Sequence, residues 1–369
     1  MKKVTSELLG RRIRDERKLR GQTQEEVARK VSVDRTVLNK IENGTRRVSA
    51  LELADIASAI EVRMASFFEE PLPAVVSHRS SQGLDPEDSQ IDTLLSDCAS
   101  EVEFVHELAP FIPRKSAQDW TVPECFDDAD AMAERARDQL GLNAIEPAKG
   151  LPNLFERIGL LVFTRELGAD TADAGTVLLQ EGGVTLVNSS SKVGRRRLAA
   201  AHELAHFLVA DEYTIDWRVG DGARNESLFD RFARGLLLPA EGLESRWTEL
   251  QGSADLRTAA VIVASEYQVD MATLSRRLLD LEIGDVPTAG DVRVVRTTRA
   301  DLIEYDLHPG DEMHGTSQPR SFQKAVLRLI QQDSISRERG LELLQGLLTM
   351  NDLPQPEMRS ADAIWDYVS

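Results

Sequence analysis

The chain has little of what marks exported or membrane-bound proteins. Its 369 residues include only two cysteines, Cys98 and Cys125, neither in a Cys-x-x-Cys or Cys/His cluster. A disulfide scaffold is therefore excluded, and two reduced thiols are expected. No stretch approaches the roughly 18 uninterrupted apolar residues of a membrane span. The N-terminus, MKKVTSELLGRR, lacks the apolar core of a signal peptide. These absences predict a cytoplasmic protein without membrane contact.

Internal repeats and low-complexity tracts are also absent, and the composition is that of a globular protein. A chain of this length exceeds one ordinary core, so two or three domains are expected. Residues 1–50 hold fourteen Lys/Arg and seven Asp/Glu, whereas the whole chain has a net charge of −18. The other 319 residues therefore carry −25. A basic head on an acidic body suggests that only the head meets a polyanion.

Helix, strand and turn signals divide the chain into four parts. Residues 1–70 have the pattern of short helices, and residues 71–90, rich in Pro, Ser, Gly and charge, that of a linker. Residues 91–250 combine helices with β-prone runs. Residues 251–369 form a helical region, for which a winged-helix-like unit at 254–285 is one interpretation. The predicted fold class is mainly α with a small β-sheet (α+β).

The strand predictions rest on short apolar runs punctuated by glycine. Three such runs, Leu160–Thr164, Thr176–Leu179 and Val184–Asn188, predict a small sheet. Val184–Asn188 is expected at an edge, where a strand can pair with an extended peptide. Further along, Val292–Arg296 is predicted as a strand and Ser321–Thr349 as helical.

Residues 21–47 read GQTQEEVARKVSVDRTVLNKIENGTRR and carry the signals of two short helices joined by a tight turn. Thr23 can N-cap the first helix, with Glu26 closing a capping box. Asp34 can cap the second helix, which Gly44 ends. A helix-turn-helix presents the N-terminal part of its second helix to the DNA major groove.

The outward positions of this motif carry side chains suited to DNA. Arginine suits guanine, asparagine suits adenine, and threonine can touch a base or a thymine methyl. Other polar side chains are placed more like phosphate contacts. The base-reading candidates are Arg35, Thr36 and Asn39, and the phosphate candidates are Gln24, Lys40, Arg46 and Arg47. One helix pair reads only a short half-site, so a double-stranded operator would require a homodimer.

The segments TQEEVA, KIENG and LELADIASAIEV resemble the Cro/repressor-type helix-turn-helix, also called the XRE family, over about residues 7–69. The resemblance implies an all-α DNA-binding domain that regulates transcription. Two alternatives stay open. One is a helical bundle with a solvated basic face, and the other is a helix-turn-helix that serves only dimerisation or partner binding.

A metal motif, His-Glu-Leu-Ala-His, occupies residues 202–206 in a strongly helical stretch. Because residues i and i+4 lie on one helix face, His202 and His206 can share one Zn²⁺. Zinc lowers the pKa of its bound water, and Glu203 beside a ligand can take the proton. This is the chemistry of peptide hydrolysis by a metalloprotease. The alternative is a structural helix with two partnered histidines.

A catalytic zinc usually has three protein ligands and an open position. The helix expected at about Asn225–Leu237 places Glu226 and Asp230 on one face. Glu226 fits a third ligand, and Asp230 could orient a ligand histidine through its other ring nitrogen. The alternative is a pair of surface carboxylates on an amphipathic helix. On the motif helix, Arg195–Arg197 are expected to form a solvated face rather than a DNA contact.

The segments VTLVN, RRRLAAAHELAHFL and E-x-x-x-D-R-F-A-R-G-L-L-L-P resemble the ImmA/IrrE family of metallopeptidases, a gluzincin-like group, over about residues 130–245. The site that the resemblance implies holds one Zn²⁺ per chain on His202, His206 and Glu226, with Glu203 as general base. Family members commonly have Gly in place of Ala205. They often have Ala-Asn or Ala-Asp in place of Phe229-Asp230, a departure that keeps the carboxylate.

These motifs predict a bacterial, DNA-binding transcription regulator fused to a zinc-dependent endopeptidase. The family resemblance implies that it cleaves a partner repressor or antitoxin, or itself, in stress- or mobile-element-linked gene control. It would be nucleoid-associated when bound to DNA. One alternative is an antitoxin or transcription factor whose zinc site only senses or stabilises, and another is a protease with a vestigial basic head. Glu203 favours the endopeptidase over these alternatives, since a structural site needs no base. Residues 290–369 lie outside the motifs.

Overall fold

The computed structural model describes residues 5–19, 22–60, 62, 64–67, 77–79, 89–113, 120–169, 171–209 and 222–355. The chain divides into two compact units, Met1–Leu72 and Pro73–Ser369. Most of the expected linker lies outside the described residues. Its described parts are a short strand at 77–79 and the start of a helix at 89. No described helix is long and apolar enough to cross a membrane.

The first unit consists of short helices around one apolar core. Its elements are α1 (Ser6–Leu19), α2 (Gln24–Lys30), α3 (Arg35–Glu42), α4 (Ala50–Ile60) and the 3₁₀ turn η1 (Met64–Phe67). Thr23 and Glu26 form the expected capping box at the start of α2. After α3 the backbone turns at Gly44, where φ is +71° and a Cβ would lie 2.5 Å from the Cα of Glu7. Only glycine fits this turn without strain.

A buried ion pair holds α1 against α3. The Arg17 guanidinium donates to both carboxylate oxygens of Glu42, at 2.6 and 2.9 Å. Glu42 is fully buried at the end of α3, and the partner cation compensates for the loss of its hydration. The pair therefore fixes the orientation of the second helix of the motif.

The second unit contains a four-stranded sheet in the order β1-β3-β4-β2. Its strands are β1 (Ser77–Arg79), β2 (Leu160–Arg165), β3 (Ala174–Leu178) and β4 (Gly183–Asn188). β4 pairs parallel with β2 and antiparallel with β3, while β1 pairs antiparallel with β3. The mainly α architecture with a small mixed sheet confirms the predicted fold class.

The expectation that Val184–Asn188 forms an edge strand is wrong, because β4 lies between β3 and β2. Every residue of β4 is buried, as expected for an inner strand covered on both faces. The edges of the sheet are β1 and β2. The three-residue β1 carries no apolar run, so its pairing was not visible in the sequence pattern.

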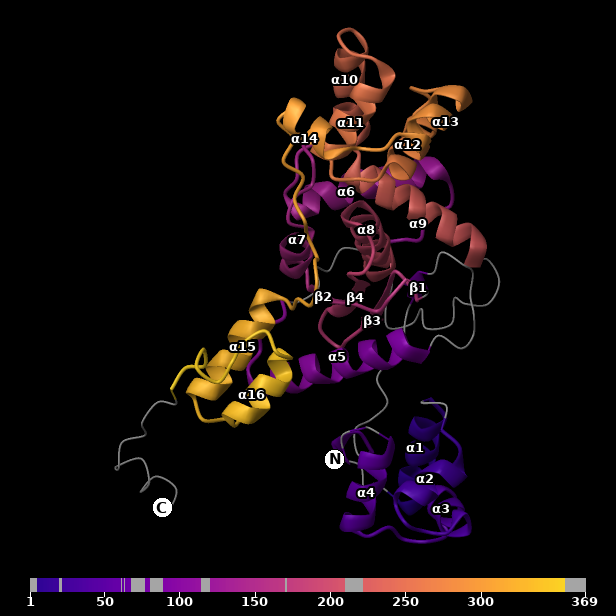
Figure 1. Cartoon of the computed structure of the whole chain (residues 1–369), viewed down its shortest axis with the longest axis vertical. Coiled ribbons are helices and arrows are strands. Elements are labelled where there is room, and N and C mark those ends of the chain that lie inside the picture. The colour runs from indigo at the N-terminus through magenta and orange to yellow at the C-terminus, as the bar shows by residue number, and fades with distance from the viewer. Residues whose placement is uncertain are drawn as a thin grey trace. The chain divides into compact units, whose positions relative to one another are not determined.

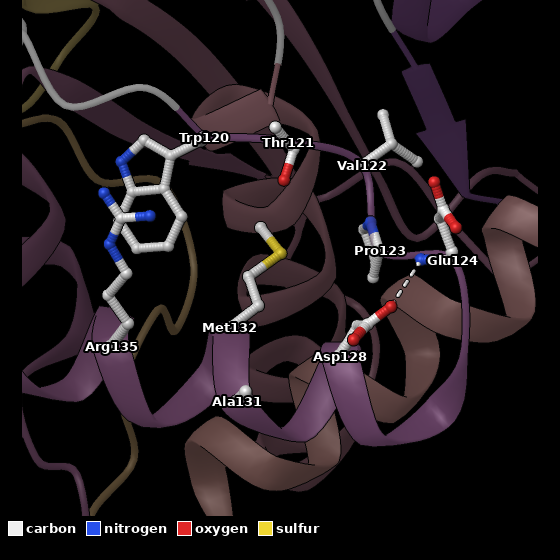
Figure 2. Close-up of a pocket in the computed structure, with 9 residues that line it drawn as sticks. All are labelled: Trp120, Thr121, Val122, Pro123, Glu124, Asp128, Ala131, Met132 and Arg135. Carbon is white, nitrogen blue, oxygen red and sulfur yellow. Dashed lines mark hydrogen bonds between the residues drawn. The ribbon is translucent and has the colours of Figure 1, made fainter.

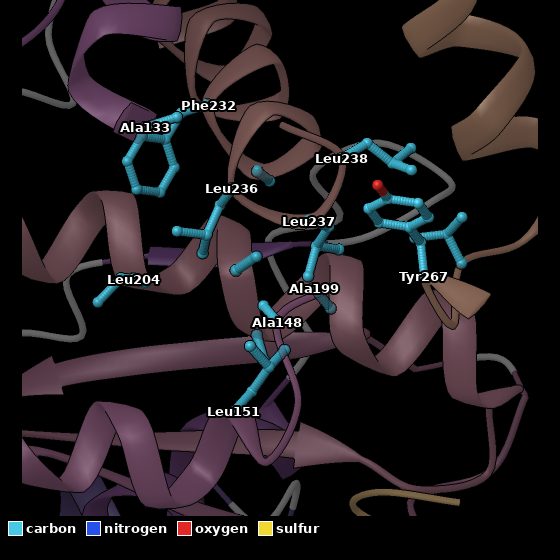
Figure 3. Packing of buried hydrophobic residues seen from close by; sticks show 14 of the residues in the cluster. Ala133, Ala148, Leu151, Ala199, Leu204, Phe232, Leu236, Leu237, Leu238 and Tyr267 are labelled. Carbon is cyan, nitrogen blue, oxygen red and sulfur yellow. The ribbon is translucent and has the colours of Figure 1, made fainter. Parts of the chain in front are cut away.

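Helices cover both faces of this sheet (Figure 1). The long helix α8 (Val193–Val209) packs on one face, and α5 (Ser89–Leu108) packs on the other. α9 (Gly222–Leu237) lies along α8, and α6 (Phe126–Leu140) lies along α9. At the α6–α9 crossing a Cβ on Gly235 would stand 3.0 Å from the Cβ of Ala133, so small residues permit the close approach. Figure 3 shows the leucines and aromatic rings that fill the core between these helices.

The remaining elements follow α6 and α9 along the chain. They are α7 (Leu151–Arg157), α10 (Ala240–Gln251), α11 (Leu256–Glu266), α12 (Met271–Asp280), α13 (Val286–Val294), α14 (Arg299–Glu304), α15 (Arg320–Gln331) and α16 (Arg337–Leu344). The expected strand at Val292–Arg296 is wrong. Asp285 caps α13 there and Pro287 occupies its first turn, both of which favour a helix. Because α13 follows α12 directly, residues 254–285 lack the strand hairpin of a winged helix. The helical stretch at 321–349 is two helices, divided at Asp333, where φ is +55°.

Residues 311–317, for which the sequence suggested no role, hold the start of α8. Arg197 is fully buried and pairs with Glu312 at 2.7 Å, while the buried Arg196 bonds to Asp311. Glu312 also accepts the backbone N–H of Gly150 at 2.7 Å. The expected solvated face is therefore wrong for these two arginines. Their acidic partners lie more than 100 residues away in the sequence.

The neighbouring Arg195 is partly exposed and pairs with Asp173 at 2.8 Å. The bridge between Thr164 and Ser317 adds a backbone contact at the outer side of β2. The segment after α14 therefore completes the body of the second unit.

Replacing Glu312 by Ala should lower the free energy of unfolding by about 3–5 kcal/mol, because Arg197 would stay buried without its partner. Urea unfolding followed by circular dichroism measures the change. Glu304→Ala, at an exposed position at the end of α14, is the control and should change stability by less than about 0.5 kcal/mol. Equal stabilities of the two variants would contradict a structural role for the ion pair.

Candidate functional site

Three side chains of the types that ligate metals converge between α8 and α9. His202 and His206 lie one turn apart on α8, and Glu226 projects from the first half of α9. One ligand atom from each lies within 4.8 Å of the others. The Nε2 atoms of the two histidines are 3.1 Å apart, and the nearest Glu226 oxygens lie 3.0 Å from His202 and 3.5 Å from His206. The structure thus brings together the three ligands expected from the sequence.

The two histidines are deeply buried. His202 is 1% exposed and His206 is not exposed at all. The ring of Phe229 stands edge-on to both imidazoles, with centroid distances of 6.2 Å to His202 and 4.5 Å to His206. Burial, reinforced by the neighbouring His202, lowers the pKa of His206 well below its usual value. His206 is therefore neutral near pH 7, which is the form that binds metals.

Asp230 sets the orientation of the first histidine. Its Oδ1 lies 2.9 Å from Nδ1 of His202, and its position one turn after Glu226 places both carboxylates on the same face of α9. A hydrogen bond from Nδ1 to a carboxylate leaves the lone pair on Nε2. That Nε2 is the atom facing Glu226 and His206.

The residues present fit a zinc ion. Two imidazole nitrogens and one carboxylate are a common ligand set for catalytic zinc, with the fourth position open. The two Nε2 atoms lie 3.1 Å apart, close enough for one cation to bind both. Glu203, the neighbour of His202 in α8, is fully buried beside this cluster. Its assignment as general base stays a prediction.

A salt-bridge network anchors α9 directly after Asp230. Asp130 of α6 accepts from Arg231 at 2.5 Å and from Arg277 of α12 at 2.6 Å. Asp280 of α12 accepts from Arg231 at 3.1 Å and from Arg234 at 2.5 Å. The network joins three helices, and it holds the turn that carries the two acidic site residues in place against α8.

A cavity of about 450 Å³, which the sequence gave no reason to expect, lies beside α6 (Figure 2). It lies between the start of α6 and the chain just before it. The Arg135 guanidinium lies 4.2 Å from the ring centroid of Trp120, and the backbone N–H of Glu124 donates to Asp128 at 3.2 Å. Met132 adds an apolar floor. The cavity combines apolar side chains with the carboxylates of Glu124 and Asp128.

In the first unit, α3 presents most of the predicted DNA contacts. The exposed residues of this helix are Arg35, Thr36, Asn39 and Lys40. Two other candidates have partners within the unit. Gln24 donates to Asn39 at 3.2 Å and to Glu42 at 2.8 Å, and Arg46 pairs with Glu52 at 2.7 Å. Asp34 precedes α3 as expected, but its side chain makes no capping hydrogen bond.

Comparison with known proteins finds a matching family in each unit. A family described as Helix-turn-helix matches residues 13–67, and a peptidase family described as the IrrE N-terminal-like domain matches residues 155–279. An uncharacterized HTH-type transcriptional regulator of Bacillus subtilis (strain 168), YazB, is 40% identical over 59 residues. The aligned part is 16% of this chain and 86% of that protein. Both resemblances inferred from the sequence motifs are confirmed.

Elemental mass spectrometry of the purified protein should find about one zinc per chain. Glu226→Ala should lose most of it, because two ligands remain, and Asp230→Asn should weaken zinc affinity about 10–100-fold. The control is Glu244→Ala, at an exposed position of α10. Wild-type protein that takes up no zinc even when zinc is supplied would exclude this ligand set.

Proposed function

Because this chain belongs at residues 13–67 to the helix-turn-helix regulators and at residues 155–279 to the IrrE N-terminal-like peptidase family, we propose that it is a DNA-bound zinc endopeptidase. The observation that carries the proposal is the cluster of His202, His206 and Glu226, with a buried glutamate beside it in α8. A site that only stabilised the fold would have no use for that fourth group.

Each residue of the site has a separate task. His202, His206 and Glu226 would hold one zinc, which when bound would lower the pKa of a water molecule and polarise the scissile carbonyl. Glu203 takes the proton of the attacking water and passes it to the leaving amine. Asp230 keeps Nδ1 of His202 protonated, so that Nε2 faces the metal. The surrounding apolar side chains keep bulk water from the two histidines.

The substrate is a protein, either a repressor or antitoxin partner or another copy of this chain. The basic first unit binds a double-stranded operator as a homodimer, with Arg35, Thr36 and Asn39 at base edges. Lys40 and Arg46 contact phosphates, Arg46 after exchanging its Glu52 partner. Gln24 positions Asn39 from α2. Cleavage of a bound regulator then changes transcription under stress, in the bacterial cytoplasm at the nucleoid.

Glu203→Gln should reduce peptide cleavage by a factor of about 10² or more, because the general base is lost while the metal ligands remain. The zinc-loaded protein is incubated with a proteome-derived peptide library, and new N-termini are counted by mass spectrometry. The matched control is Glu244→Gln, and zinc content and DNA binding should be unchanged in both variants. Wild-type protein with full zinc and no new N-termini would favour a zinc sensor over a peptidase.

DNA binding should weaken steeply with salt, as phosphate contacts require. On a duplex selected from a random pool, Arg35→Ala should weaken binding by about 1–3 kcal/mol and relax the sequence preference. Lys40→Ala should weaken binding to all sequences and reduce the salt slope by about 1. The control is Ser58→Ala, at an exposed position of α4. If no duplex is selected, the first unit serves another purpose.

A further inference from the structure

The edge of the sheet beside α8 is occupied by the chain's own β1. β3 runs antiparallel to β4, and β1 pairs antiparallel with the outer side of β3 through Ser77↔Thr176, His78↔Gly175 and Arg79↔Ala174. These three residues belong to the segment that follows the DNA-binding unit. An outer strand edge offers a row of backbone N–H and C=O groups to any extended peptide.

This edge is level with the metal site. α8 is fixed to the sheet at two points: Arg195 pairs with Asp173 just before β3, and the ring of Phe207 lies against Gly183 of β4, the residue that pairs with Leu178 of β3. The twelve residues from Arg195 to Phe207 span about 18 Å of helix, and the five from Asp173 to Leu178 span about 17 Å of strand.

Because these two lengths are nearly equal, distances along the helix can be compared with distances along the strand. His202 lies about 10 Å along the helix from Arg195. The residue about 10 Å along the strand from Asp173 is Thr176, and the partner of Thr176 in β1 is Ser77. β1 thus runs past the sheet edge at the height of the two histidines.

The other surroundings of β1 also suit a peptide. The opposite edge of the sheet, at β2, already has a backbone bridge between Thr164 and Ser317. Backbone pairing at the outer side of β3 is therefore the interaction by which an extended peptide would be held there.

We infer that Ser77–Arg79 is an internal competitor that occupies the place of a substrate's extended backbone on β3. The inference rests on the proposed peptidase function and adds its regulation: a protein substrate must displace β1 before it can lie beside the metal site. A strand of only three residues makes few backbone hydrogen bonds, so a longer peptide that pairs with all of β3 can replace it.

Proline substitution tests the pairing, because proline has no N–H to donate. Successive N–H groups of a strand point to opposite sides, so Ser77→Pro/Arg79→Pro and His78→Pro remove donors from different sides of β1. One of the two variants therefore releases β1 from β3, and the other is its matched control. Hydrogen exchange at residues 174–176 identifies the releasing variant by faster exchange.

In the full-length, zinc-loaded protein, the releasing variant should cleave the peptide library at least ten-fold faster than wild type, with unchanged zinc content. The control should behave as wild type. Loss of cleavage in the releasing variant would overturn the inference, because β1 would then be the strand on which substrates dock. An unchanged rate would overturn it as well.

A binding measurement keeps the inference separate from the peptidase activity. In the Glu203→Gln background, a fluorescent peptide with the sequence of residues 74–81 should bind the releasing variant at least ten-fold more tightly than the parent. If the peptide binds in this way but the protein with Glu203 intact cleaves nothing, the proposed function is overturned. The role of β1 as a competitor then still stands. Cleavage of the library together with equal peptide binding by the releasing variant and the parent would keep the proposed function and overturn the role of β1 as a competitor.

Discussion

The second unit is organised around a helix that is buried on almost every side and yet carries two histidines and a glutamate. Buried polar groups need partners, and α8 cannot supply them to itself. α9 brings Glu226 and Asp230 to the histidines, and Phe229 packs edge-on against both imidazole rings. α9 is in turn held by the acidic groups of α6 and α12, so the neighbouring helices all contribute to positioning one turn of chain.

Buried ion pairs connect the helices within each unit. In the first unit Arg17–Glu42 connects the first and third helices. In the second, Asp130 connects three helices, and Arg197–Glu312 connects α8 to a segment 115 residues further along the chain. Such pairs stabilise a fold little compared with apolar packing, but each one is costly to break. They therefore favour one arrangement of the helices over others.

Features that depend on neighbouring residues were predicted from the sequence better than features that depend on residues far apart in the chain. The capping box at Thr23, the Gly44 turn, the three strand runs and the facing pairs at 202/206 and 226/230 all depend on residues within one or two turns of each other, and each appears in the structure. The errors share another cause. The place of β4 inside the sheet depends on its parallel pairing with β2, from which β3 separates it along the chain. The burial of Arg196 and Arg197 depends on Asp311 and Glu312, and the cavity beside Trp120 depends on how a non-helical segment returns to α6. No periodicity in the sequence reports such distant pairings.

The contact of Glu312 with Gly150 and Arg197 also has a consequence for the order in which the protein matures during translation. Domains tend to fold as units as the chain leaves the ribosome, N-terminal parts first. The helix-turn-helix unit is closed by contacts within its own residues, so it can fold early. The metal-site helix keeps two buried cations without counter-charges until residues 311 and 312 have emerged. A nascent chain would therefore hold a folded helix-turn-helix unit well before His202, His206 and Glu226 are brought together.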